Sequence, residues 1–142
     1  MGAAIGVYFA IDNPGMVQKL VVADTITSSP SNAGIPDLFG PRVELAQTDC
    51  DGIQKLTESA LERRFSANFR ESQPAEIDRM RQLMWTTSKE AYITCCHALR
   101  HDSFDMQPLP GKVGSSVENV HLVVGELNVN LPETMETMRQ EI

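Results

Sequence analysis

"MGAAIGVYFAIDNPGMVQKLVVADT", residues 1–25, is the stretch that decides the fold. Its first twelve residues are apolar on nearly every face, and small residues such as Gly2 and Gly6 let another backbone approach closely. The Asn-Pro-Gly run at residues 13–15 ends this segment, so the pattern predicts a buried helix followed by a turn. The β-branched run at residues 20–23 then indicates a strand of a parallel sheet that is covered on both faces.

The middle of the chain reads as a loop followed by helices. Residues 25–41 are rich in Ser, Pro and Gly, whereas residues 49–101 carry apolar side chains at helical spacings, which predicts about three helices. The third helix is expected to start at Thr87, because Glu90 three residues later completes a capping-box pattern. The first apolar stripe consists of Ile53, Leu56 and Ala60, and the second, in a helix expected to begin at Pro74, consists of Ile77, Met80 and Met84. The third stripe consists of Tyr92, Cys96 and Leu99.

A second buried-type strand is predicted within residues 120–127, and a last helix from Pro132. The order of helix, strand, helices, strand and helix indicates an α/β fold in which two parallel strands flank a large helical excursion. Each strand of such a pair has one unpaired edge, and unpaired edges recruit neighbours. We therefore expect a homo-oligomer that forms through the exposed strand edges.

The composition is that of one ordinary globular domain, with a net charge of −7 over 142 residues. The basic residues are scattered, which argues against nucleic acid or a membrane as partner, because both are bound by clustered Lys and Arg. The three cysteines, Cys50, Cys95 and Cys96, offer no even disulfide framework, so a cytoplasmic location is expected. Residues 1–12 lack the basic region of a signal peptide, and Gly6 stands where a myristoylation pattern has Ser or Thr.

Three further segments follow the opening stretch, and both the segments and their order along the chain carry information: "ALERRFSANF" at 60–69, "EAYITCCHALRHDSF" at 90–104 and "LVVGELNVNLPETM" at 122–135. Together they resemble an α/β-hydrolase, and more narrowly the 3-oxoadipate enol-lactonase group. In that group they correspond to cap-helix segments, the strand before the catalytic acid, and the acid loop. The resemblance implies a partial α/β-hydrolase core formed by residues 1–24 and 113–142, with a loop and helical cap over residues 25–112.

The resemblance also implies where the catalytic groups belong. The nucleophilic Ser of the G-x-S-x-G elbow would directly precede Met1, whose backbone nitrogen takes the place of an oxyanion donor. Asn128 occupies the place of the catalytic acid, and an amide can orient an imidazole but cannot supply the stabilising negative charge. The His base would follow Ile142, and the three histidines match no catalytic position: His97, His101 and His121. We therefore expect the Ser nucleophile and the His base to be missing.

Two carboxylates are candidates near that site. Asp24 closes the first strand, at the edge where α/β sheets place ligands, although a residue in this position more often caps a turn, here with Thr25. Glu126 follows the second strand, although a Glu in that position is more often simply solvated. His97 and His101 share a helix face, but charge balance at a helix end explains His101 without a metal, and no metal or cofactor is expected.

Four residues of the cap segments are candidates for binding substrate. The resemblance places them in the roof of the substrate pocket: Arg64, Met84, Trp85 and Tyr92. Arg64 is the most specific of them, because an enol-lactone acid needs a cation for its carboxylate. The simpler alternatives are a solvated arginine and an apolar stripe that packs in the core.

Three functions remain open at this point. The first is an α/β-hydrolase-fold protein related to ester and enol-lactone hydrolases, with a small-molecule substrate but an incomplete triad. The second is a non-hydrolytic binding or oligomerisation module, as the unpaired strand edges suggest. The third is an isomerase or cyclase in which Asp24, Glu126 or His97 carries the proton.

Overall fold

The computed structural model describes residues 1–126, 128 and 131–142. By their internal contacts these residues form two compact units. The sheet unit consists of Met1–Ile35 with His101–Ile142, and the helical unit is Pro36–Arg100. The boundaries between the two units fall at residues 35/36 and 100/101. The base and cap boundaries that the resemblance implies, at 24/25 and 112/113, stay a prediction.

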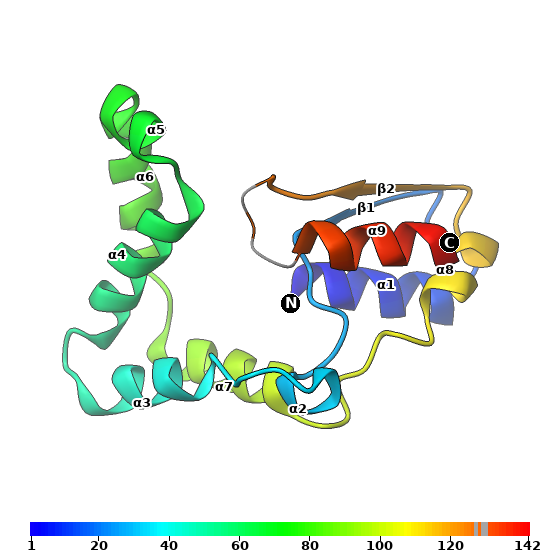
Figure 1. Cartoon of the computed structure of the whole chain (residues 1–142), viewed down its shortest axis with the longest axis horizontal. Coiled ribbons are helices and arrows are strands. Elements are labelled where there is room, and N and C mark those ends of the chain that lie inside the picture. The colour runs from blue at the N-terminus through cyan, green and yellow to red at the C-terminus, as the bar shows by residue number, and fades with distance from the viewer. Residues whose placement is uncertain (127, 129–130) are drawn as a thin grey trace. The chain divides into compact units, whose positions relative to one another are not determined.

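The sheet unit contains the predicted helix, parallel strands and final helix (Figure 1). Its elements are α1 (Gly2–Asp12), β1 (Lys19–Ala23), α2 (Pro30–Ala33), α8 (Pro110–Ser116), β2 (Asn119–Val123) and α9 (Leu131–Glu141). The short helix α2 interrupts the predicted loop, because Ser29 caps it by accepting a hydrogen bond from the Asn32 amide at 3.2 Å. The loop segments that precede and follow the helical unit are also part of the sheet unit. They contact each other, since the Met106 amide donates a hydrogen bond to the Thr27 carbonyl at 2.6 Å.

The two strands pair in parallel, as predicted, in a register that runs from Lys19 opposite Asn119 to Ala23 opposite Val123. Alternate side chains point to opposite faces of a sheet. One face packs into the core, where Val22 is fully buried, whereas the other leaves Val21 60% and Val123 53% exposed. The expectation of a sheet covered on both faces is therefore wrong for the described residues, because α1, α8 and α9 all pack on one side.

Helix α1 is the buried helix that the opening stretch predicts. It packs Ala4, Val7 and Ala10 into the core together with Met135 and Met138 of α9. The turn after α1 reverses the chain, so α1 runs antiparallel to β1. The N-termini of α1 and α9 consequently lie at the same end of the sheet as the carboxyl ends of the strands (Figure 1).

The helical unit contains α3 (Gly40–Thr48), α4 (Gly52–Arg64), α5 (Ala67–Ser72), α6 (Pro74–Trp85) and α7 (Lys89–Arg100). The predicted apolar stripes lie on α4, α6 and α7, whereas α3 and α5 were not expected. Helix α3 packs against both α4 and α7, and α4 packs against α6. An ion pair of 2.6 Å between Asp37 and Arg100 joins the two ends of this unit.

The start of α7 differs from the prediction by one residue. The Ser88 hydroxyl, not Thr87, accepts a hydrogen bond from the Ala91 amide at 3.3 Å. The same hydroxyl donates to the Glu90 carboxylate at 3.0 Å. Because two adjacent hydroxyl residues both precede the helix, the sequence pattern alone does not decide between them.

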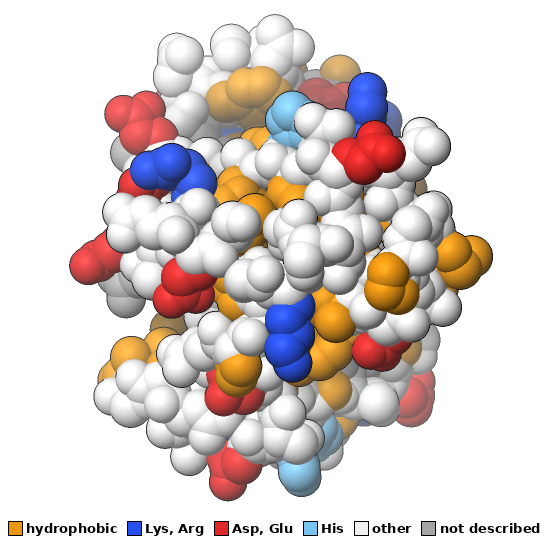
Figure 2. Space-filling model, turned by 90° about the vertical axis from the view of Figure 1, so that its right-hand side faces the viewer, with side chains coloured by type: hydrophobic (Ala, Val, Ile, Leu, Met, Phe, Trp, Pro, Cys, Tyr) orange, Lys and Arg blue, Asp and Glu red, His pale blue; other side chains and the backbone are white. Residues whose placement is uncertain are grey.

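The surface is of mixed charge. Figure 2 shows acidic and basic side chains interspersed among hydrophobic ones on the face that it displays. Within the described part of the chain, no helix is both long and apolar enough to cross a membrane.

Candidate functional site

The carboxyl edge of the sheet brings Asp24 and Gly125 together. The Gly125 amide donates to Oδ1 of Asp24 at 3.0 Å, and the Asp24 amide donates to the Val123 carbonyl at 3.0 Å. Asp24 has a φ of 43°, in the left-handed region that Asp tolerates better than most residues. Its carboxylate therefore ties the ends of the two strands together, and its capping partner is Gly125 rather than Thr25.

Asn128 lies at the same edge. Its amide donates to the Gly125 carbonyl at 3.0 Å, and its own carbonyl accepts from the Leu131 amide at 2.8 Å, where α9 begins. Its side chain folds back over Gly125, since Nδ2 of Asn128 lies 3.3 Å from the point that a Cβ on this glycine would occupy. Asn128, which the resemblance assigns to the acid loop, and Asp24 thus both form a hydrogen bond with Gly125. Leu127 of the same motif lies outside the described residues.

Met1 stands at the N-terminus of α1, where its carbonyl accepts from the Ile5 amide at 3.1 Å. Figure 1 places this end of α1 at the carboxyl edge of the sheet. A helix N-terminus carries unpaired amides and a partial positive charge, which favour an anion. The edge therefore combines one amide-rich helix end with Asp24 and Asn128, whereas Glu126 is exposed and makes no hydrogen bond with any described residue.

No acid–base pair is formed by the histidines and carboxylates that the structure describes. Nδ1 of His101 lies 2.8 Å from the Ser103 hydroxyl, and His121 is an exposed residue of β2. His97 is exposed on α7. A Ser–His–acid triad needs an imidazole held by a carboxylate or an amide oxygen, and the described side chains do not supply this contact.

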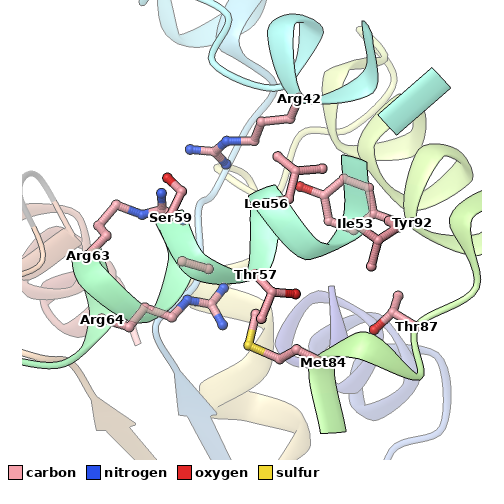
Figure 3. Close-up of a pocket in the computed structure, with 11 residues that line it drawn as sticks. Arg42, Ile53, Leu56, Thr57, Ser59, Arg63, Arg64, Met84, Thr87 and Tyr92 are labelled. Atoms are coloured by element: carbon pink, nitrogen blue, oxygen red, sulfur yellow. The ribbon is translucent and has the colours of Figure 1, made fainter. Parts of the chain in front are cut away.

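A pocket of about 140 Å³ lies within the helical unit (Figure 3). Three of the predicted substrate-binding residues line it, namely Arg64, Met84 and Tyr92, whereas Trp85 does not line it and is 46% exposed. Whether these residues bind substrate stays a prediction. The other lining residues are Arg42, Ile53, Leu56, Thr57, Ser59, Ala60, Arg63 and Thr87.

Three arginines dominate the charge of this pocket. Arg42 comes from α3, with its guanidinium 5.5 Å from the centre of the Phe39 ring, and Arg63 and Arg64 come from the last turn of α4. Partial burial, together with the positive charges of Arg42 and Arg64, lowers the pKa of the Arg63 guanidinium below its usual value. Arg42 is not among the residues that the sequence predicts for this pocket, because residues 25–41 have a loop-like composition and no helix is expected at α3.

The remaining polar groups of the helical unit offer little chemistry. Cys96 is buried, and this burial raises the pKa of its thiol, which disfavours the nucleophilic thiolate. Burial likewise raises the pKa of Tyr92, with the neighbouring Cys96 as a second cause. Among the described residues, three possible metal ligands lie close together, Asp49, Cys50 and Asp51. Asp49 already pairs with Lys55 and accepts from the Asp51 amide.

Comparison with known proteins supports the fold. No protein-family model and no curated protein matches the chain. The enol-lactonase from Burkholderia xenovorans LB400 is similar in structure, with a TM-score of 0.67 and 18% identity over 99% of this chain and 60% of that one. A hydrolase from Pseudomonas aeruginosa PA01 is similar with a TM-score of 0.61 and 16% identity, over 96% of this chain and 59% of that one.

Both of these structures have the α/β-hydrolase fold, which confirms the fold prediction. The chain spans about 60% of the length of either structure. At these levels of identity the likeness concerns the fold, and it leaves the activity of this chain open.

Proposed function

We propose that this chain is an α/β-hydrolase-fold protein related to ester and enol-lactone hydrolases, and that residues 1–142 by themselves do not hydrolyse such substrates through a Ser–His–acid triad. The observation that carries the proposal is the carboxyl edge of the sheet. The N-terminus of α1, Asp24 and Asn128 lie at this edge, and at the corresponding edge an α/β-hydrolase holds its nucleophile and its acid.

The chemistry of this edge supports the second half of the proposal. The resemblance gives Asn128, with its uncharged side chain, the acid position, and no described imidazole is hydrogen bonded to a carboxylate. The resemblance gives Met1, which directly precedes α1, the position of the oxyanion donor. The edge can therefore favour an anion, but the described residues that meet there, Asp24, Gly125 and Asn128, include no Ser or Cys that could attack an ester carbonyl.

Covalent labelling with a fluorophosphonate probe and turnover of p-nitrophenyl acetate test this proposal. We expect neither a label nor turnover above that of the heat-denatured chain. A stoichiometric label on any residue of the native chain would overturn the claim of a missing nucleophile. The nucleotide sequence upstream of Met1 adds a second test: if it encodes, in frame, a strand that ends in Gly-x-Ser, the longer chain should be labelled at that Ser.

A second candidate function is a non-hydrolytic binding or self-association module. The exposed sheet face with Val21 and Val123 favours it, because α/β sheets bury both faces in stable proteins. In the described residues each strand also has only one partner strand.

We also propose a cytoplasmic location. The three cysteines, Cys50, Cys95 and Cys96, are all free thiols, which suits a reducing compartment. The test is fractionation of the source cells, and recovery of the chain from an extracellular or periplasmic fraction would contradict the proposal.

A further inference from the structure

Strand β2 has a free edge whose backbone groups can be assigned one by one. The Asn119 amide donates to the Gln18 carbonyl at 3.2 Å, just before β1. Because backbone groups alternate in direction along a strand, the odd-numbered residues of β2 face β1, whereas the amides and carbonyls of Val120 and Leu122 point away from it. No hydrogen bond joins these outward groups to any residue that the structure describes.

The composition of this edge favours pairing with a further strand. Residues 119–124, with the sequence NVHLVV, contain no Asp, Glu, Lys or Arg and no Pro or Gly, and half of them are valines. The edge of β1 is better protected, because it carries the exposed Lys19 and ends at Asp24, whose φ of 43° departs from extended backbone. The free edge of β2 is therefore the one that is open to pairing.

A second copy of β2 is complementary to this edge. Two antiparallel copies related by a two-fold axis at His121 pair along the whole strand, from Asn119 to Val123. Val120 of one copy then lies opposite Leu122 of the other, and these are the residues with outward backbone groups, so each such pair can exchange two hydrogen bonds. A register shifted by one residue would instead bring core-facing side chains of one copy to the exposed face of the other.

The side chains agree with this register on both faces of the sheet. Val120 and Leu122 are half-buried and pack against the core of the sheet unit, so pairing them across the axis covers apolar surface that is still exposed. On the other face the axis brings the two His121 side chains together. They form a pair without mutual backbone hydrogen bonds, and the Cα atoms of such a pair are about 4.5 Å apart.

We propose that two copies of this chain associate through antiparallel pairing of their β2 strands about a two-fold axis at His121. The two sheets then form one four-stranded sheet in the order β1, β2, β2, β1. The proposal rests on the second candidate function, the self-association module, and names the edge and the register that carry it. Each copy contributes a strand of only 5 residues, so the association should be reversible and dependent on concentration.

Cysteine cross-linking tests the position of the axis. Cys50 and Cys95 are exposed, so the parent chain carries Cys50→Ser and Cys95→Ser and retains the buried Cys96. In this parent, His121→Cys should give a covalent dimer on oxidation with diamide, because the spacing of the central pair fits a disulfide. On a non-reducing gel most of this variant should migrate as a dimer, whereas the parent should migrate as a monomer.

Two further cysteine variants are the controls. Val21→Cys is the matched one, because Val21 is 60% exposed and pairs with His121 in the register of the sheet, but lies on β1. In the proposed dimer the two copies of Val21 are three strand spacings apart, and the two copies of Asn119 lie at opposite ends of the paired strands. Both separations are about 14 Å, which no disulfide spans, so neither Val21→Cys nor Asn119→Cys should cross-link above the parent.

Amide hydrogen exchange of the wild-type chain gives a readout that needs no substitution. The amides of Val120 and Leu122 gain hydrogen bonds only in the dimer, so their exchange should slow several-fold as the concentration of the chain rises. The amide of Val21 points outward from β1 and serves as the control, since its exchange should not depend on concentration.

Four results would overturn the proposal. A wild-type chain that stays monomeric would remove both this interface and the self-association module. Association without cross-linking of His121→Cys and without slowed exchange at Val120 and Leu122 would leave the module but exclude this interface. A covalent dimer of Val21→Cys alone would place the contact at β1. Slow exchange at Val120 and Leu122 at every concentration would show that another segment of the same chain covers the edge. Fluorophosphonate labelling has no bearing on these outcomes.

Discussion

Asp24 shows how one residue can hold the edge of the sheet together. Its carboxylate accepts from the Gly125 amide, while its backbone adopts a φ of 43°. Asp24→Ala should lower the free energy of unfolding by about 1 kcal/mol, because the hydrogen bond is lost and Ala tolerates the left-handed region less well. Asp24→Asn should retain most of the stability, since its amide oxygen still accepts the bond.

Urea unfolding, followed by circular dichroism, measures the effect at Asp24. Asp102→Ala is the control, because the Asp102 side chain is exposed and makes no hydrogen bond with the described residues. Equal stabilities of Asp24→Ala and Asp102→Ala would show that the link between Asp24 and Gly125 contributes nothing.

Asp37 should make the stability of the helical unit depend on pH. Partial burial opposes ionisation, but the amides of Phe39 and Gly40 and the Arg100 guanidinium outweigh it and lower the pKa of Asp37. A carboxyl whose pKa is lowered by folding stabilises the protein above its unfolded pKa of about 3.9, and this stabilisation is lost as the pH falls through the folded pKa.

The wild type should therefore lose about 1 kcal/mol more unfolding free energy than Asp37→Asn between pH 6 and pH 2, a small value because solvent screens the pair. Urea unfolding of both chains at the two pH values measures the difference. All other carboxyls are common to both chains, so identical pH dependence would exclude this role for Asp37.

Helix α7 provides a test at the scale of an element. Ser88 caps it through the Ala91 amide, whereas the sequence pattern favoured Thr87. Ser88→Ala should cost about 1 kcal/mol of unfolding free energy, and Thr87→Ala should cost clearly less. Thermal and urea unfolding measure the free energy of unfolding of both variants. A larger loss of this free energy in Thr87→Ala than in Ser88→Ala would show that Thr87 caps α7.

Some helices and strands can be predicted from the sequence pattern alone, and others cannot. The β-branched runs that became β1 and β2, and the apolar stripes of α4, α6 and α7, are periodic signals that depend only on local spacing. Helix α3 was missed because Gly40 and Pro41 read as loop residues, although Pro is favoured in the first turn of a helix. Because Arg42 lies on α3, a prediction without this helix does not include Arg42 among the candidate site residues.

At the scale of the whole molecule, the exposed sheet face should drive self-association. Val21 and Val123 lie exposed on it, and each strand has one unpaired edge in the described residues. Size exclusion with light scattering at micromolar concentration should show species larger than the monomer. Val123→Lys should shift the population toward the monomer, because a charge on this surface opposes pairing.

Leu83→Lys is the control for this experiment, since Leu83 is 52% exposed on α6 and lies outside the sheet. It should leave the association unchanged. A well-folded wild-type monomer at the same concentration would remove the main support for the self-association module.

The sequence by itself determined the α/β class, the parallel pair of strands and the helix that precedes them. These follow from local periodicity and from the turn at residues 13–15, which are physical properties of short segments. Only the tertiary structure decided that Asp24 bonds to Gly125, 101 positions away, and that Arg42 and Arg63 line one pocket without carboxylate partners. Such contacts depend on how distant segments pack, and no local pattern encodes that packing.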